Sequence, residues 1–348
     1  MTSDAAPVLV AVDGRTARIT LNRPRALNAL TPAMVRRIAS VLDTLESDPA
    51  VRTVVLDGAG ERGLCAGADI RLFHDDARSG DHTASQDFLR DEYRLNSRIA
   101  HYPKPYVAVM DGIVMGGGVG LSAHGSVRLV TERSRIAMPE VGIGLVPDVG
   151  GTWLLARAPG HLGTHLALTG ASIGAADALL CGLADHCVPS SQLPQLLADL
   201  AESTPDEAVA RHERPAPVGV LAEQRAWIDA CYAADTVEEI VDRLVSCGEP
   251  AAKEAAETLH SRSPAALKAT LESLRRAARL DSLEQALDQE YRVSCAALGT
   301  HDLPEGIRAQ IIDKDRNPQW SPATLAEVEQ ADVERYFAPL GERELGLG

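Results

Sequence analysis

The pattern of apolar and polar positions divides the chain into two parts of different character. In the first part, short apolar runs that end at turn residues alternate with longer stretches of helical period. Strands are predicted at 51–58, 106–112 and 127–131, after a hairpin over 8–24 that turns at Asp13-Gly14. Helices are predicted at 31–47 and 85–102. Thr31 is the expected N-cap of the first, with Pro32 behind it. This alternation is typical of an α/β architecture.

From about Pro205 the strand-like runs end and helical patterns dominate, with Ser or Thr at several expected helix starts. Helices are predicted within 217–234, 236–246, 250–261, 263–280 and 282–298. We therefore expect two domains. Residues 1–205 form an α/β core with the active site, and residues 206–348 form a helical region that packs on this core or on a neighbouring subunit.

Composition narrows the classes of partner. The 348 residues carry a formal net charge of -15, which argues against nucleic acid, because binding along phosphates needs a basic surface. A small anion held by a few local arginines stays possible. The six cysteines are scattered without a CxxC pair, so reduced thiols are expected rather than a zinc site or disulfides. We see no signal peptide and no membrane span, and expect a cytoplasmic protein.

The glycine-rich stretch "MGGGVGLSAHG" (115–125) permits several interpretations. It matches neither the dinucleotide-binding frame G-x-G-x-x-G nor a P-loop. As a serine-hydrolase elbow it lacks the glycine two residues after Ser122, and a helix would turn Ser122 and His124 to different faces. A strand-to-helix turn that presents backbone N–H groups to an anion or oxyanion, and a tight turn required only for packing, both stay open.

Two further candidates favour ordinary structural roles. "HLGTH" (161–165) places two histidines on one helical face, but without a glutamate between them or an evident third ligand. An ordinary surface face is therefore favoured over a zinc site. A single cysteine such as Cys65 is more often a small buried residue than a nucleophile.

The stretch "MPEVGIGLVPDVGG" (138–151) is apolar and yet contains Glu140 and Asp148. Buried acids cost free energy unless they are paired, hydrogen-bonded or protonated. Two loops rich in small residues, 63–73 and 110–120, follow predicted strands and can each bring one backbone N–H to a common point. Such a pair stabilises the oxyanion of a thioester, and carboxylates near it can act as base, acid or nucleophile.

Four motifs carry a family resemblance. "LNRPRALNALT", "CAGADIR", "GGGVGLSAHG" and "AMPEVGIGLVPDVGG" resemble the enoyl-CoA hydratase/isomerase (crotonase) superfamily in their order and separations. The segment "HDLPEGIRAQIIDKDRNPQW" (301–320) is similar to one found in a hydrolase branch of that superfamily and absent from ordinary hydratases. The resemblance covers nearly the whole chain. It implies an α/β fold with a spiral core of ββα units followed by helices, and a homo-oligomer, trimeric or hexameric.

The resemblance also implies site residues. Ala68 and Gly117 would supply the two N–H groups of the oxyanion hole. Hydratases of the family use two glutamates, and here the position of the first is Gly120 while the second is Glu140. The hydrolase branch instead pairs this glutamate with an aspartate, matched by Asp148.

A glutamate of the preceding helix that contacts substrate in that branch is matched by Glu92. Glu140 would activate water or attack the thioester carbonyl. Asp148 would bind the 3-hydroxyl of the acyl group or orient Glu140, and Glu92 would help to fix the acyl end. The structural alternatives are that Glu140 binds backbone N–H groups and that Asp148 caps a helix beginning near Gly151.

The implied reaction is hydrolysis of a short β-hydroxyacyl-CoA, such as 3-hydroxyisobutyryl-CoA of valine breakdown, to the free acid and coenzyme A. Coenzyme A would enter only as part of the substrate, so no cofactor is expected, and neither is a nucleic-acid or membrane partner. Two alternatives are an enoyl-CoA hydratase or isomerase working with one acid, and a non-catalytic acyl-CoA-binding scaffold.

The polyanionic coenzyme A needs local cations and backbone contacts. The residues that match the nucleotide rim of the family are Arg23, Arg25, Ala26, Ala66, Ala68, Ile70 and Arg71. For any single arginine among them, ordinary solvated surface charge is an equal alternative. For Glu305, Arg308 and Lys314 of the 301–320 segment, an internal salt-bridge network is the simplest explanation.

Overall fold

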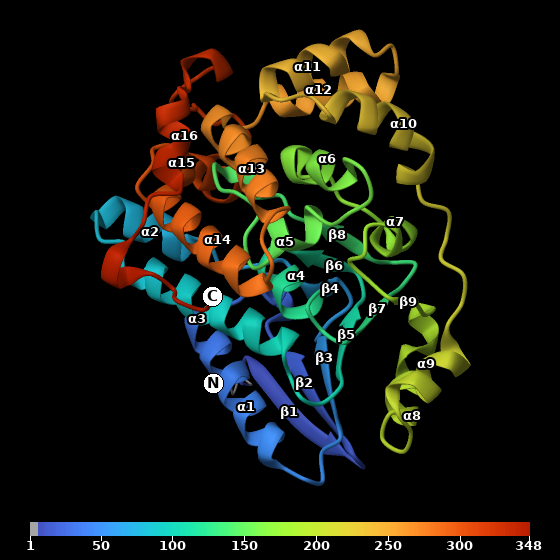
Figure 1. The fold of residues 1–348 in the computed structure, drawn as a ribbon. Coiled ribbons are helices and arrows are strands. Elements are labelled where there is room, and N and C mark those ends of the chain that lie inside the picture. The colour runs from blue at the N-terminus through green and yellow to red at the C-terminus, as the bar shows by residue number, and fades with distance from the viewer. Residues whose placement is uncertain (1–5) are drawn as a thin grey trace. The chain divides into compact units, whose positions relative to one another are not determined.

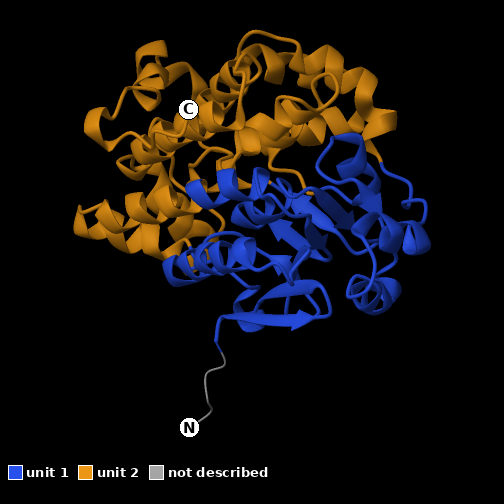
Figure 2. Cartoon of the chain, turned by 60° about the horizontal axis from the view of Figure 1, so that its bottom comes forward, with its two compact units in different colours: residues 1–69, 94–137, 173–219 blue, residues 70–93, 138–172, 220–348 orange. Residues whose placement is uncertain are grey.

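A computed structural model describes residues 6–348, which form two compact units (Figure 2). Unit 1 consists of the chain up to residue 69, together with 94–137 and 173–219. Unit 2 consists of 70–93, 138–172 and 220–348. Both units thus combine segments that are distant in sequence, and their boundaries do not coincide with residue 205.

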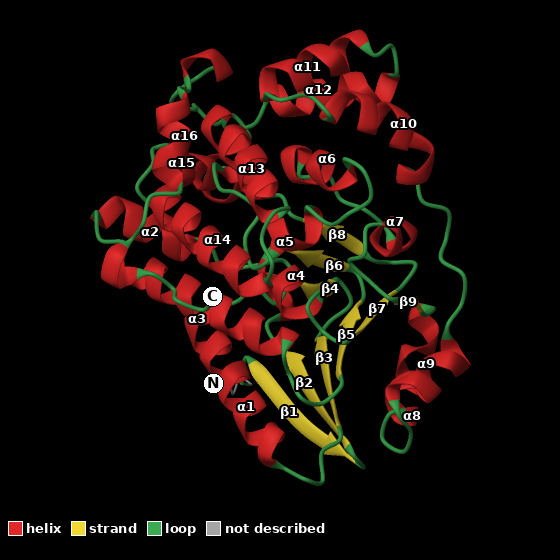
Figure 3. Ribbon diagram, viewed as in Figure 1, coloured by secondary structure: helices red, strands yellow, loops and turns green. Residues whose placement is uncertain are grey.

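Unit 1 contains two sheets (Figures 1 and 3). The larger sheet has the order β1-β2-β3-β5-β7-β9, with β1 (Val8–Asp13), β2 (Thr16–Leu21), β3 (Thr53–Gly58), β5 (Tyr106–Met110), β7 (Val127–Val130) and β9 (His186–Cys187). The smaller sheet has the order β4-β6-β8, with β4 (Gly63–Cys65), β6 (Ile113–Met115) and β8 (Arg135–Ala137). Only β1 and β2 pair antiparallel; all other neighbours are parallel.

The two sheets are connected by a repeated path of the chain. Each of β3, β5 and β7 in the larger sheet is followed at once by a strand of the smaller sheet, namely β4, β6 and β8. Helices follow the first two of these pairs: α2 (Arg71–Ser79) and α3 (Thr83–Ala100), and then α4 (Gly117–Ser122). This is the expected succession of ββα units, and the α/β spiral core is confirmed.

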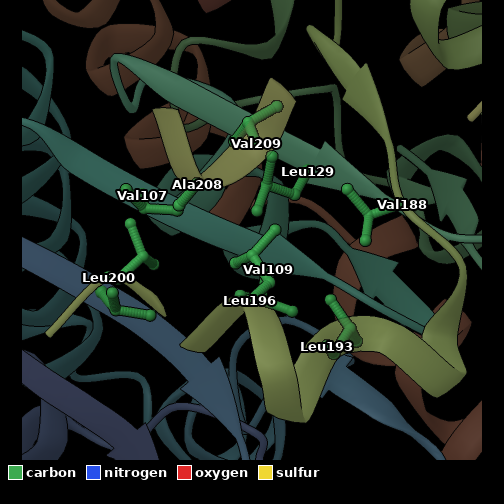
Figure 4. Close-up of a cluster of buried hydrophobic side chains, with 10 residues drawn as sticks. Val107, Val109, Leu129, Val188, Leu193, Leu196, Leu200, Ala208 and Val209 are labelled. Carbon is green, nitrogen blue, oxygen red and sulfur yellow. The ribbon is translucent and has the colours of Figure 1, made fainter. Parts of the chain in front are cut away.

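The central strands β3 and β5 of the larger sheet are buried because helices cover them. All residues of β5 and nearly all of β3 are buried, as continuous apolar runs in parallel strands require. Leu193, Leu196 and Leu200, at α8 (Leu193–Asp199), pack with Val107 and Val109 of β5 (Figure 4). Each such side chain contributes about 1.5–3 kcal/mol by leaving water.

The same cluster includes Ala208 and Val209 of α9 (Pro205–His212). Unit 1 is completed by α1 (Pro32–Ser47), α7 (Ala175–Leu180), and the second part of α3. The side chain of Thr31 accepts a hydrogen bond from Met34 N, so the predicted N-cap of α1 is confirmed.

Unit 2 is helical. Besides α2 and the first part of α3 it contains α5 (Gly151–Leu155), α6 (Leu162–Thr169), α10 (Leu221–Tyr232), α11 (Val237–Ser246), α12 (Pro250–His260), α13 (Pro264–Ala277), α14 (Leu283–Leu298), α15 (Asp302–Ile307) and α16 (Gln330–Tyr336). Thr236, Ser263 and Ser282 cap α11, α13 and α14 through their side chains. The predicted helical character after residue 205 is confirmed.

Candidate functional site

Unit 2 contains four buried carboxyl groups that interact with one another electrostatically. Glu92 lies on α3, Glu140 begins the short 3-10 helix η2 (Glu140–Ile143), and Asp148 lies between η2 and α5. Glu290 lies on α14. Glu140 and Asp148 are only 7% and 6% exposed, and Glu92 only 1%. The structure thus brings together, within one unit, the three acids that the sequence predicted.

The hydrogen bonds of these acids differ. Tyr93 Oη donates to Asp148 Oδ2 at 2.7 Å, and Tyr93 Oη lies 2.8 Å from Ser294 Oγ. Because the single Tyr93 proton is used on Asp148, the Ser294 hydroxyl donates to Tyr93. Glu92 Oε1 and Glu140 Oε2, in contrast, have no hydrogen-bond partner among residues 6–348. Asp148 is therefore held in place, whereas Glu92 and Glu140 each retain an oxygen available to a ligand.

Burial raises the pKa of all four carboxyl groups, because a charge loses its hydration there. Burial raises the pKa of Asp148 to about 6, although the hydrogen bond from Tyr93 acts in the opposite direction and lowers it. Burial and the neighbouring Asp148 raise the pKa of Glu140 and of Glu92 well above the ordinary range. The acids of the cluster therefore hold their protons to higher pH than exposed carboxyl groups do, which suits groups that must accept or deliver protons.

For the thioester hydrolysis expected from the sequence, Tyr93→Phe should move the acid limb of the pH profile of kcat/KM to higher pH. The hydroxyl stabilises the ionised form of Asp148 and lowers its pKa, so without it a higher pH is needed to ionise this carboxyl. We expect a shift of about one pH unit or less, measured from initial rates across pH 5 to 9. Ser97→Ala, on the same helix, is the control. An unchanged acid limb would show that Asp148 does not control this ionisation.

The turn that carries Glu140 is packed against the C-terminal segment 301–320. A Cβ added at Gly144 would lie 2.6 Å from the carbonyl carbon of Asp302, and one at Gly306 would lie 2.5 Å from Ile143 Cα. Only glycine allows this approach of η2 and α15. The Asp302 carboxylate accepts hydrogen bonds from Ser263 Oγ and Ser321 N. The segment 301–320 thus supports the Glu140 turn.

The charged residues of that segment form the expected salt-bridge network. Arg308 pairs with Glu305, Asp313 and Asp315. Lys314 takes no part in these pairs; it has a positive φ of 59°.

In unit 1, two loops of the smaller sheet come close to each other. A Cβ added at Gly67, whose φ is 100°, would lie 3.5 Å from Gly117 N. Leu30 forms a parallel bridge with Ala68, in which Leu30 N donates to Gly67 O and Asp69 N donates to Leu30 O. These bonds use the neighbours of Ala68 and leave its own N–H pointing away from Leu30.

Gly117 is the first residue of α4, where an N–H has no acceptor within the helix. At the next position, a Cβ on Gly118 would lie 2.6 Å from Cys65 O, so glycine is required for the close packing of the two loops. The glycine-rich stretch is therefore a strand-to-helix turn, from β6 into α4; glycine at position 118 serves packing, and the binding of an oxyanion stays a prediction.

The predicted nucleotide rim is divided between the units. Arg25 and Ala26 lie in the exposed 3-10 helix η1 (Pro24–Ala26) of unit 1. Ala66, in the same unit, donates its N–H to Leu27 O. Ile70 and Arg71 lie at the start of α2 in unit 2.

The two arginines at η1 differ in their partners. Arg23 pairs with Asp69 and also donates to Ala29 O, so its charge is already used within the protein. Arg25 makes no ion pair with any residue of the described chain. Of the two, Arg25 is thus better suited to meet a phosphate.

Three other candidates have structural roles. Ser122 donates to Gly118 O within α4, and the buried Cys65 Sγ lies 3.3 Å from Asn28 O. The expectation of a surface face at "HLGTH" is wrong for His165, which is buried. Its Nδ1 lies 2.9 Å from Tyr232 Oη, and burial lowers the pKa of His165 to about 4. The pattern failed there because α10 covers this face of α6.

Residues 6–348 contain no cluster of three or more His, Cys, Asp or Glu side chains arranged to hold a metal ion. None of the helices in this range has both the length and the apolar character needed to cross a membrane.

Sequence reasoning missed three polar residues of the acid cluster: Tyr93, Ser294 and Glu290. Tyr93 follows Glu92 directly, and Glu290 and Ser294 are one helical turn apart in a stretch interpreted only as amphipathic helix. Their spacing places both on one face of α14. A polar pair at that spacing in an otherwise apolar face was the one available signal.

Comparison with known proteins relates these features to a family. The family model described as enoyl-CoA hydratase/isomerase matches residues 16–337. A curated relative from Danio rerio, named 3-hydroxyisobutyryl-CoA hydrolase, mitochondrial, is 44% identical over 96% of this chain and 90% of its own.

Two solved structures share the fold. One, titled a carnitinyl-CoA dehydratase from Mycobacterium thermoresistibile, has a TM-score of 0.95 and 55% identity, covering 99% of each chain. Another, titled an enoyl-CoA hydratase from Rhodobacter sphaeroides, has a TM-score of 0.93 and 48% identity, covering 98% of this chain and 99% of its own. This chain belongs to the enoyl-CoA hydratase/isomerase family.

Proposed function

We propose that this protein hydrolyses the thioester of a short β-hydroxyacyl-CoA, and that its substrate is 3-hydroxyisobutyryl-CoA. The observation that carries this proposal is the cluster of Glu92, Glu140 and Asp148 in unit 2, combined with glycine at position 120. Curated relatives that bear the name 3-hydroxyisobutyryl-CoA hydrolase, and that this chain matches over 90–92% of their length, support it.

Glu140 is the group that initiates the reaction. As a carboxylate it takes a proton from water that attacks the thioester carbonyl, or attacks that carbon itself to form an acyl anhydride that water then cleaves. In both cases the C–S bond breaks, coenzyme A leaves as a thiol and the acyl group becomes the free acid. Burial and the neighbouring Asp148 raise the pKa of Glu140, which makes its carboxylate a stronger base than an ordinary one.

Glu92 and Asp148 select the acyl group. Asp148, ionised above about pH 6, accepts a hydrogen bond from the 3-hydroxyl. Burial raises the pKa of Glu92, so this carboxyl group in its protonated form donates one to an oxygen of the acyl end. A substrate without the hydroxyl would leave the Asp148 carboxylate unpaired, which costs more than the bond itself is worth.

Ala68 N–H and Gly117 N–H are proposed to bind the oxyanion that develops on the thioester carbonyl. Arg25 and the backbone at Ala26, Ala66 and Ile70 are proposed to bind coenzyme A. The reaction needs only a thioester and water, so coenzyme A enters only as part of the substrate. The absence of a separate cofactor stays a prediction.

Hydration or dehydration is the second candidate, because the two solved relatives bear titles of that kind. Gly120 argues against it, since α4 contains no carboxylate and a hydratase of this family holds water between two acids. Cytoplasmic location and a homo-oligomer stay predictions; the curated relatives named above are described as mitochondrial.

The test is a comparison of two signals on the same substrates. Free thiol and enoyl-thioester absorbance are followed with 3-hydroxyisobutyryl-CoA, 3-hydroxybutyryl-CoA, carnitinyl-CoA and crotonyl-CoA. We expect rapid thiol release from the first and no change in enoyl absorbance. Faster change of enoyl absorbance than of thiol would favour a hydratase or dehydratase. Tight coenzyme A binding without turnover would favour a non-catalytic scaffold.

A further inference from the structure

The backbone directly after Asp148 has an unfavourable conformation. Val149 has a φ of 52° and Gly150 a φ of 80°. A positive φ is ordinary for glycine but a true outlier for a β-branched residue. Such strain costs free energy and persists only where surrounding contacts determine the conformation. The turn that positions Asp148 therefore needs an external support.

Glu290 of α14 provides contacts of this kind. Its Oε2 accepts a hydrogen bond from Gly150 N at 2.6 Å, and its Oε1 accepts one from Thr152 N at 2.9 Å and one from Thr152 Oγ1 at 2.5 Å. Both oxygens are thus fully engaged by the residues that follow Val149. Glu290 is 0% exposed, so no water replaces these bonds.

The same helix also supports the Asp148 side chain. Ser294, one turn after Glu290 on α14, contacts Tyr93 Oη, and Tyr93 in turn donates to Asp148 Oδ2. One face of α14 therefore determines the backbone after Asp148 through Glu290 and the carboxyl of Asp148 through Ser294 and Tyr93. Burying a carboxyl group is expensive, and burial raises the pKa of Glu290 to about 8. The free-energy cost of burying Glu290 must therefore be offset by the interactions that its carboxyl group makes.

We propose that Glu290 is a positioning residue for Asp148: it holds the strained turn at residues 149–152 through the two backbone N–H groups and the Thr152 hydroxyl, without contacting substrate. Its effect on catalysis rests on the proposed function, whereas its effect on the turn does not. The two effects can therefore be measured separately.

The experiment uses Glu290→Gln in the full chain, with Gln289→Leu as the matched control. Gln cannot accept at both ends, so its amide NH₂ would face one of the backbone N–H donors. Gln289 is the neighbouring buried polar residue of α14, and within residues 6–348 its side chain donates a hydrogen bond only to Ser273 O on α13. Hydrogen exchange of the peptide covering 148–155 is measured by mass spectrometry, and kcat and KM are measured by thiol release.

We expect amide exchange of this peptide to rise about tenfold or more in Glu290→Gln and to stay unchanged in Gln289→Leu. We also expect kcat to fall about 10- to 100-fold with KM within a factor of about three, since misplacing a catalytic group by 1 Å costs about a hundredfold. Glu290→Asp is one methylene shorter, and in this variant both the amide exchange of the 148–155 peptide and kcat should stay changed from wild type, as in Glu290→Gln. Gln289→Leu should lower the melting temperature and leave kcat unchanged.

Unchanged exchange of the 148–155 peptide in Glu290→Gln would overturn the proposal, as would an unchanged kcat in an active enzyme. If Glu290→Gln does not fold, Thr152→Val is measured in its place, with Thr152→Ser as its control. Thr152→Val removes one of the three donors to Glu290, whereas Thr152→Ser keeps the hydroxyl. Equal amide exchange of the 148–155 peptide in these two variants would overturn the proposal. If the wild-type protein releases no thiol, the proposed function fails, and the exchange data still decide whether Glu290 holds the turn.

Discussion

Glu140→Gln is expected to lower kcat for thioester hydrolysis by about a hundred- to ten-thousandfold, the range over which a positioned general base acts. The amide has nearly the shape of the carboxylate but can neither take a proton from water nor attack a carbonyl. Glu140 is buried, with Oε2 free of any partner in the described chain, so the substitution breaks no hydrogen bond of that atom. The measurement is initial thiol release under saturating substrate.

Affinity for coenzyme A, measured by calorimetry, should be almost unchanged in Glu140→Gln. Glu223→Gln, the same chemical change at an exposed position of α10, is the control and should keep full activity. Retention of more than about a tenth of wild-type kcat by a folded Glu140→Gln protein would remove Glu140 from the reaction.

Ala68→Pro is expected to lower kcat by about a hundred- to a thousandfold, as the loss of one oxyanion donor does. Proline removes the N–H, which is not used in the bridge to Leu30, because that bridge is formed by Gly67 O and Asp69 N. The fold should therefore survive, and the melting temperature provides the check. Activity is followed as thiol release.

Ala68→Ser retains the N–H and serves as the control, with activity expected within a few-fold of wild type. A folded Ala68→Pro protein with wild-type kcat would show that this N–H does not bear the oxyanion. Loss of activity in both variants would point to the side-chain position rather than to the donor.

The fold could be predicted to a large extent because its determinants are local. Continuous apolar runs marked β3, β5 and β7, and Ser or Thr caps marked the helices of unit 2. The smaller sheet was missed, since β4, β6 and β8 have only three residues each. Strands that short have no detectable period.

The site was predictable where a chemical requirement appears in the sequence itself. Burying an acid in an apolar stretch, such as Glu140 or Asp148, costs free energy, so its presence there indicates a specific role. A run of glycines identified the turn at Gly117. These features determined the residue types of the candidate site and, through the resemblance they carry, the family.

Only the tertiary structure decided which groups support these acids. Tyr93 contacts Asp148, Ser294 contacts Tyr93, and Glu290 contacts the turn after Asp148, although Glu290 and Asp148 are 142 positions apart (290 − 148). The contact depends on how α14 packs, and no local pattern encodes that packing. For the same reason the burial of His165 and the strained φ of Val149 emerged only in three dimensions. Local chemistry thus determined which residues are unusual, and long-range packing decided what each of them touches.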